Sequence, residues 1–379
     1  MDTLLNIFPV LYEAIAKFPR RQFGILRAVQ INAGLERAAI GQEIIWDQPR
    51  INAPVDVEPA CVLPCPPADT AGKKNFKMEK ARAIRIAVTG ESSLALGSSM
   101  KTRRANQYLQ AMDVLAAEIE TYLAIKAIEG ASRAWGTAGT TPFQDPTDMS
   151  YFANIYRILL ENNRNSGNLA MILNGKSSTM LRSKMSNIWK ANEFGDASLI
   201  QDGILTMIEG FAIHEINNMP SHVKGTGAAY ETDGATAAGV ADVALVVGAG
   251  TVLGGDVVTF AADTENKYVV NTGIAAPGII TLGEPGARMI IPTGNAMTIG
   301  ANYQPNVAFN ADAIGLAVRP PAVPAEGDAA IDSFIIQDPV TGLPFEIRRY
   351  AEYRQIVDEV SIAWGGKVFD PAGVVLGLS

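Results

Sequence analysis

The strongest periodic pattern in the chain lies between residues 98 and 135. Apolar side chains recur there at alternating steps of four and three, which places them on one face of a helix: Tyr108, Met112, Leu115, Ile119 and Tyr122. Ser98 or Ser99 can cap its start. A helix over residues 102–134 would be about 50 Å long at 1.5 Å per residue, far longer than the average helix, unless Gly130 ends it early.

A second apolar stripe with helical spacing lies at the N-terminus: Leu4, Phe8, Leu11, Tyr12, Ile15 and Phe18. Pro19 and two arginines end it, so we predict a short amphipathic helix. The following residues, to about 40, show no strong period and predict an arm that lies on another surface. The stripe has no evident local partner, which is typical of an interface. We therefore predict intermolecular contacts at Phe8, Leu11, Ile15 and Phe18.

The stretch from residue 41 to residue 90 predicts an extended loop. Residues 42–46 and 83–89 (AIRIAVT) have strand character, and a span rich in proline separates them. That span cannot form a core of its own, so a loop projecting from the body fits its composition. Trp46, at the end of the first strand, is added to the predicted interface residues.

Helical and strand patterns alternate after this loop. Residues 151–160 and the segment from about 177 to 189 predict helices, while 169–173 and 210–216 predict strands. This order indicates an α/β region.

From about residue 236 to residue 300 the pattern changes to short Val, Ile and Thr runs between Gly, Pro and Asn turns. No helical period occurs there, so we predict a small antiparallel barrel or sandwich, inserted as a separate domain. The chain then resumes an α/β pattern at 306–318. Its last part predicts strands at 334–337, 345–349 and 356–364, with further strand character at Val368 and Phe369.

Composition supports a mixed α+β protein with a substantial core. The chain has 379 residues, of which 48% are hydrophobic and 18% charged, and it contains 35 glycines and 21 prolines. With 39 acidic and 31 basic residues the formal charge is −8. Proteins that bind nucleic acid directly usually carry a basic surface, and this composition does not indicate one. A DNA partner would be enclosed by the protein and would not be bound sequence-specifically.

Cysteine usage and hydropathy indicate the compartment in which the protein is made. Cys61 and Cys65 are the two cysteines, which argues against a disulfide framework and for synthesis in a reducing cytoplasm. Asp2 and Pro9 do not fit a secretory signal, and no apolar stretch of spanning length lacks Gly, Pro or charge.

Two nucleotide-binding motifs fail on spacing. Gly175-Lys176-Ser177 resembles the end of a phosphate-binding P-loop, but Ala170 occupies the position of the first glycine, and a serine cap on a helix explains the segment. The glycines at 248 and 250 imitate a dinucleotide fingerprint, but the third, Gly254, comes one place late and no helix follows.

The soft metal ligands are few. The cysteine pair with His214 and His222 provides at most half a zinc site, and neither histidine lies beside a nucleophile signature. We therefore predict no catalytic, cofactor-binding or metal-binding residues.

Taken in order, these segments resemble the major capsid proteins of tailed phages with the Hong Kong 97-type fold. The resemblance covers nearly the whole chain and includes the phrases GFAIHEINNMP, FNADAIGLAV and KVFDPAGVV, the last within the closing WGGKVFDPAGVVLGLS. The β-rich block is similar to the inserted domain of coat proteins from short-tailed phages.

The resemblance implies an order of parts along the chain. In sequence these are an N-terminal arm (1–40), an extended β loop (41–92), a peripheral domain with a spine helix (93–160), the first part of an apical domain (161–235), the inserted β domain (236–300), the second apical part (301–332) and C-terminal strands (333–379).

It also implies a function and partners. The protein would self-assemble through hexamers and pentamers into an icosahedral shell around double-stranded DNA, with scaffolding, portal and decoration proteins as partners. It would reside in the virion after synthesis in the bacterial cytoplasm. The alternative within the same fold is an encapsulin-type nanocompartment shell, against which the extra β domain and the long loop stand. A nucleotide-binding enzyme is the alternative from another class and rests on the two broken motifs.

Overall fold

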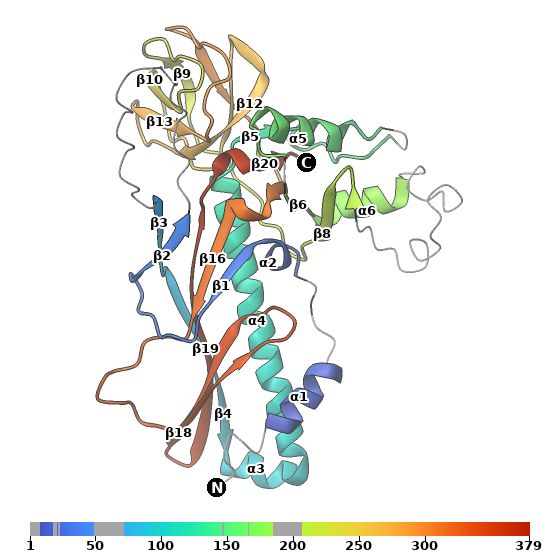
Figure 1. Ribbon diagram of the computed structural model, residues 1–379, viewed down its shortest axis with the longest axis vertical. Coiled ribbons are helices and arrows are strands. Elements are labelled where there is room, and N and C mark those ends of the chain that lie inside the picture. Colours follow the sequence, from blue (N-terminus) through green and yellow to red (C-terminus); the bar gives the residue numbers. More distant parts are fainter. Residues whose placement is uncertain are drawn as a thin grey trace, which may run out of the picture.

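The computed structural model describes residues 8–17, 21, 23–48, 72–145, 148–165, 167–184 and 207–379. The molecule is elongated, and one long helix, α4 (Met100–Glu129), runs along it beside a long sheet, with a β barrel at one end (Figure 1).

Helix α4 confirms the strongest sequence pattern. All five apolar stripe residues are at most 6% exposed. The helix has 30 residues, which is about 45 Å at 1.5 Å per residue. It ends earlier than the predicted residue 134, because Gly130 forms its C-cap and the amide of Gly130 donates to the carbonyl of Lys126. A Cβ at Gly130 would lie 2.7 Å from the Cβ of Val368, so only glycine fits against the adjacent strand.

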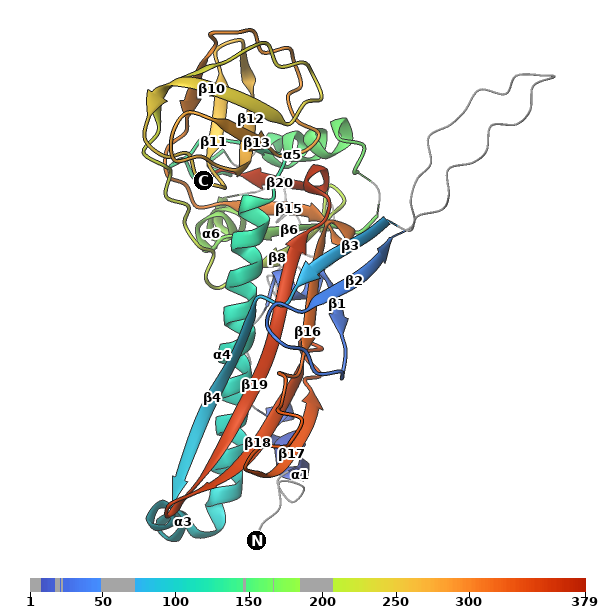
Figure 2. The ribbon, with the colours of Figure 1, turned by 90° about the vertical axis from the view of Figure 1, so that its left-hand side faces the viewer.

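A six-stranded sheet packs along α4. Its order is β1-β16-β19-β18-β17, and β4 pairs with β19. The bounds are β1 (Gln30–Ala33), β4 (Lys80–Thr89), β16 (Ile314–Arg319), β17 (Ala330–Gln337), β18 (Pro344–Glu352) and β19 (Gln355–Val368). Trp364, Ile362 and Val360 of β19 are fully buried in the same cluster as the helix stripe. The principal core therefore lies between α4 and this sheet (Figure 2).

The α/β region forms part of a second, twelve-stranded sheet. Its strands here are β5 (Arg133–Trp135), β6 (Leu169–Leu173), β7 (Met207–Ile208), β8 (Phe211–Glu215), β15 (Asn306–Asn310) and β20 (Val374–Gly377). Helices α5 (Ser150–Glu161) and α6 (Gly175–Lys184) flank it, as the alternating pattern predicts. Helix α6 corresponds to the helix predicted from about residue 177 to residue 189. The last five residues of that prediction lie outside the described part of the chain, which resumes at residue 207.

The rest of this sheet curls into a closed antiparallel barrel. Its strands are β9 (Ala228–Thr232), β10 (Asp242–Ala249), β11 (Val257–Phe260), β12 (Asp263–Thr272), β13 (Ile279–Leu282) and β14 (Ala296–Ile299). The ring closes because β11 pairs with both β14 and β12. Inward residues such as Tyr230, Val243 and Ile280 form a core of their own. Of the two predicted forms, an antiparallel barrel or a sandwich, the structure forms the barrel.

One boundary of that prediction is wrong. The barrel begins before residue 236, because β9 pairs with β10 and β14. With the sequence AAYET, β9 has too few β-branched residues to stand out. The barrel is also joined to the body by hydrogen bonds, since Lys267 and Tyr268 of β12 pair with Ala134 and Arg133 of β5.

The remaining elements are short: α1 (Phe8–Lys17), α2 (Ile25–Ala28), β2 (Glu43–Gln48), β3 (Gly72–Lys77), α3 (Gly90–Leu96) and the 3-10 turns Gly97–Ser99, Ala311–Ala313 and Pro371–Gly373. Strands β2 and β3 form a hairpin that points away from the body (Figure 2). The sequence AIRIAVT is a strand, but its expected place in this loop is wrong. It belongs to β4, whose partner is β19, because its alternating pattern matches the face of the long sheet.

Candidate functional site

The predicted N-terminal interface is partly a core contact. Leu11 of α1 is fully buried in the main cluster, and α1 lies along α4 (Figure 1). The prediction that Leu11 contacts another chain is therefore wrong. Its side chain is buried within its own chain, because α1 packs on α4, and the sequence pattern does not show which segments meet. The side chains of Phe8 and Ile15, and the whole of Phe18, lie outside the described residues. Their interface role stays a prediction.

The segment after α1 lies on its own body, not on another chain as expected of an arm. Strand β1 pairs in parallel with β16. The backbone amides of Gly24 and Ile25 donate to Oε1 of Glu120 on α4, at 2.5 and 3.2 Å. Arg37 donates two hydrogen bonds, of 3.0 and 2.6 Å, to the buried carboxylate of Glu346. Residues 23–38 are thus part of the folded unit.

Glu120 is a buried acid on the long helix. It is 4% exposed. Burial raises its pKa to about 7, although the hydrogen bonds from Gly24 and Ile25 and the charge of Arg27 act in the opposite direction. The docking of the N-terminal segment on α4 therefore depends on a group that titrates near neutral pH.

Trp46 lies at the base of the projecting hairpin. Its half-buried ring is 5.6 Å from the ring of Phe369 and packs against a small cluster that includes Met78 and Ala363. On the same strand Ile45 is 55% exposed. Trp46 thus anchors the hairpin to the body, while its predicted contact with another chain stays a prediction.

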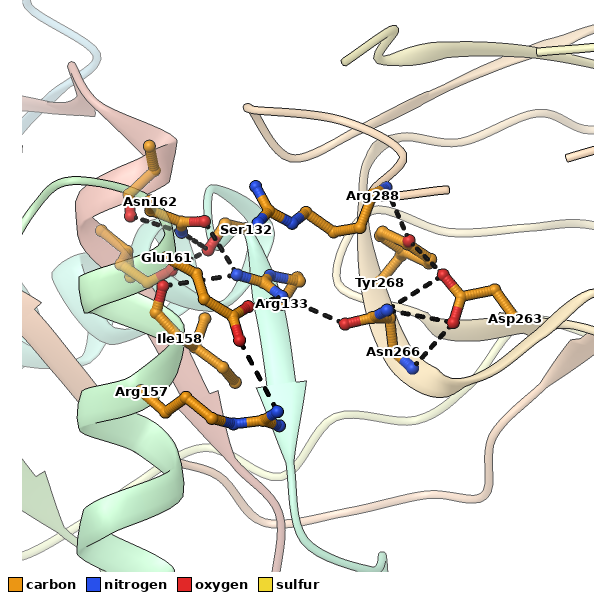
Figure 3. Close-up of polar contacts among 12 residues, drawn as sticks. Ser132, Arg133, Arg157, Ile158, Glu161, Asn162, Asp263, Asn266, Tyr268 and Arg288 are labelled. Carbon is orange, nitrogen blue, oxygen red and sulfur yellow. Dashed lines mark hydrogen bonds and ion pairs between the residues drawn. The ribbon is translucent and has the colours of Figure 1, made fainter. Parts of the chain in front are cut away.

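A buried arginine joins the barrel to the body. Arg133 of β5 is 2% exposed and lies between α5 and β12 (Figure 3). It donates to Oε2 of Glu161 at 2.7 Å, to Oδ1 of Asn162 at 2.9 Å and to Oδ1 of Asn266 at 3.1 Å. Burial lowers the pKa of its guanidinium, and the hydrogen bond to Glu161 opposes that effect. One side chain therefore links three elements.

The barrel side of this contact is itself fixed by hydrogen bonds. The backbone and side-chain nitrogens of Asn266 donate to Asp263, and the hydroxyl of Tyr268 donates to Asp263 at 2.6 Å. The backbone amide of Arg288 donates to the Tyr268 hydroxyl (Figure 3). This network holds Asn266 in place to accept from Arg133, so the barrel is positioned relative to α5 by oriented polar groups.

The segment that resembles a P-loop is a capped strand-to-helix turn. The cap is Asn174, whose Oδ1 accepts from the amide of Ser177 at 2.9 Å. The sequence interpretation placed the cap on Ser177, and this is wrong because that side chain is buried and accepts from Asn306 instead. Asn306 also accepts from the Asn174 amide. These polar groups satisfy one another within the fold.

The glycine pattern resembling a dinucleotide site lies in the barrel. Gly248 and Gly250 have φ angles of +63° and +91°, and strand β11 follows them. A Cβ on Gly248 would lie 2.7 Å from the ring of Tyr230. The two glycines therefore serve close packing inside the barrel. The predicted hairpin is wrong, because β10 pairs with β9 and β13 whereas β11 pairs with β12 and β14.

The two histidines have different surroundings. His214 is on β8, and burial lowers its pKa. Nε2 of His222 is 2.8 Å from Oδ1 of the buried Asp256, which also accepts from the amides of Gly225 and Leu253. Among the described residues no group of three His, Cys, Asp or Glu could hold a metal ion, and both cysteines lie outside that part.

The sequence analysis did not identify the buried charged residues, although the position of Arg104 is unusual in the sequence itself. Arg104 stands four residues before Tyr108 and so continues the apolar stripe of α4, where an apolar residue would be expected. Glu120 and Arg133 carried no comparable signal, because their partners are remote in sequence.

In the described part of the chain, no helix is both long enough and apolar enough to cross a membrane.

Comparison with known proteins finds similar solved structures but no similar sequences. No family model matches the sequence, and the curated proteins include no match. The structure is similar to the capsid structure of cyanophage P-SCSP1u, with a TM-score of 0.52 and 11% identity over 95% of this chain and 89% of that chain.

Two further likenesses are a structure from Mycobacterium phage Che8 (TM-score 0.45, 14% identity, 90% of this chain and 88% of that chain) and a virus-like particle from Pyrococcus furiosus (TM-score 0.42, 12% identity, 98% of each chain).

The cyanophage likeness defines the class of fold: the chain has a mixed α+β fold shared with a phage capsid protein. The resemblance to the major capsid proteins of tailed phages is thus confirmed at the level of the fold.

Proposed function

We propose that the protein is the major capsid protein of a tailed phage, which assembles from many copies into an icosahedral shell. The observation that carries the proposal is the fold shared with the cyanophage capsid structure over 95% of this chain. A fold can host several functions, so the architecture must also suit the task. An elongated subunit with a projecting hairpin can reach across neighbours in a closed surface.

The finer Hong Kong 97-type arrangement belongs to the same proposal. Helix α4 would be the spine helix, and β4, β17, β18 and β19 would form the peripheral sheet beside it. The β2–β3 hairpin would belong to the extended loop, and β6, α6 and β8 to the apical domain. The barrel from β9 to β14 would be the inserted domain, used in folding and in contacts with neighbours.

The partners follow from this role. Copies of the chain would form hexamers and pentamers, with scaffolding, portal and decoration proteins as further partners and double-stranded DNA inside. The formal charge of −8 favours DNA that is enclosed without being bound tightly. The protein would reside in the virion after synthesis in the bacterial cytoplasm, and it would catalyse no reaction.

Electron microscopy of the purified protein tests the proposal. Negative staining should reveal closed shells or rings of capsomers. Particles that enclose protein cargo instead of DNA in infected or producing cells would contradict the capsid role, and a stable monomer at high concentration with scaffold present would contradict assembly altogether.

A point substitution on the hairpin tests its proposed contact with neighbours. Ile45 is 55% exposed, so Ile45→Asp should leave the monomer folded. At an interface the buried charge would block shell closure. Ile45→Val is the matched control and should assemble normally. Equal assembly of both variants would remove the hairpin from the interface.

A further inference from the structure

A cavity of about 800 Å³ is lined by elements at the end of the molecule opposite the barrel. Helix α3, one of these elements, lies at the bottom of Figure 1. The end of β4, helix α3, the first turns of α4, strand β17 and the turn between β18 and β19 enclose the cavity. Its volume lies within the range of about 300–1,000 Å³ that is usual for small-molecule sites. Nothing in the proposed function assigns a role to it.

Charged side chains line this cavity in unequal number. The cations are Lys101, Arg104, Arg349 and Arg354, and the anions are Asp332 and Glu352. Arg349 is already committed to the buried Asp358, to which it donates at 2.7 and 3.2 Å. The hydroxyl of Tyr108 donates to the same carboxylate. Asp358 is therefore satisfied without Arg104.

Arg104 forms only a long ion pair with the same carboxylate. It is 8% exposed, and its Nε is 4.0 Å from Oδ2 of Asp358, too far for a hydrogen bond. Among the described residues this buried Nε has no hydrogen-bond partner. A buried donor on a charged group is costly when it is unpaired. A carboxylate is the group that best matches the planar guanidinium.

The rest of the lining determines the size and charge of the ligand. Val88, Met100, Ile331 and Ile356 provide apolar walls. A dianion such as phosphate would lose much hydration against these walls and would be repelled by the two lining acids. A monoanion with an apolar stem avoids most of both costs.

We propose that this cavity binds a monocarboxylate on an apolar stem, with the carboxylate at Arg104 and the stem against the aliphatic walls. The site does not depend on the proposed capsid function. The same chemistry is offered by a free organic acid and by an Asp or Glu side chain, set among apolar residues, from a second copy of the chain.

Three probes test the contributions of the carboxylate and of the apolar stem separately. Isothermal titration calorimetry of the monomeric protein should detect hexanoate. Acetate lacks the stem and should bind about a hundredfold more weakly, since four methylene groups are no longer buried. Hexanol lacks the charge and should bind at least about tenfold more weakly, because a hydrogen bond to a charged group is lost.

Substitutions locate the site. Arg104→Gln should weaken hexanoate at least about tenfold while the protein stays folded, because Asp358 keeps Arg349. Ile331→Asp, at a position 51% exposed, should also weaken it by placing a negative charge at the rim. Arg85→Gln is the control, because Arg85 pairs with Glu359 and does not line the cavity.

Sedimentation velocity distinguishes the source of the ligand. If hexanoate binds and also dissociates oligomers that Arg104→Gln cannot form, the carboxylate comes from a second copy. If hexanoate binds and association is unchanged, the ligand is a free acid. Either result supports the site. Hexanoate that fails to bind, or that binds equally to the wild type and Arg104→Gln, overturns it.

Discussion

The carboxyl group of Glu120 should make the stability of the protein depend on pH. It is buried on α4 and accepts from the backbone amides of Gly24 and Ile25, so it couples the N-terminal segment to the long helix. The informative substitution is Glu120→Gln. Glutamine has nearly the same shape, and its Oε1 can accept the same two hydrogen bonds, but it cannot ionise.

The magnitude follows from the pKa, which burial raises from 4.5 to about 7. Because a tenfold change in proton affinity corresponds to about 1.4 kcal/mol, ionising the buried group costs about 3 kcal/mol relative to the unfolded chain. The folded state holds the proton more tightly than the unfolded state does. The stabilisation is therefore complete below pH 4.5 and is lost as the pH rises through about 7.

Urea unfolding of monomeric protein between pH 4 and pH 8.5 measures the effect. The free energy of unfolding of the wild type should fall by about 3 kcal/mol relative to that of Glu120→Gln over this range. Glu118→Gln is the control, because Glu118 forms an exposed pair with Arg82 and should change little. Hydrogen exchange at the amides of Gly24 and Ile25 should follow the same trend.

Parallel pH dependence in the wild type and Glu120→Gln would refute the reasoning. It would mean that Glu120 ionises without a penalty, and hence that water reaches the carboxylate and the segment is not docked as described.

Two further substitutions test packing, both by urea unfolding. Arg133→Met should destabilise the protein by about 3 kcal/mol, because it removes the partner of the buried Asn162 and of the partly buried Glu161 and Asn266. Arg157→Gln, at a side chain that is 49% exposed, should cost less than about 0.5 kcal/mol. Gly365→Ala should cost at least about 3 kcal/mol, because its Cβ would lie 2.0 Å from a backbone oxygen of β3. Gly278→Ala, with its nearest neighbour at 3.7 Å, should be nearly neutral. Equal effects within either pair would contradict these packing arguments.

The sequence alone determined the elements whose signal is local. The stripe from Tyr108 to Tyr122 predicts α4 because a repeat of 3.6 residues can bury one face only as a helix. The short strands after residue 236 predict an antiparallel barrel or sandwich, because brief strand runs between glycine turns carry no helical period. The closure of the ring between β11 and β12 is visible only in the structure. The order of these elements was enough to suggest the capsid fold.

Tertiary structure decided which segments meet. The strand AIRIAVT pairs with β19, about 270 residues later in the chain, since the register of a strand depends on the face that it can bury. The partner of Leu11 is likewise a helix far along the chain. The charged side chains of Arg104, Glu120 and Arg133 acquire their roles only through burial, because the sequence records a charge but not the solvent around it.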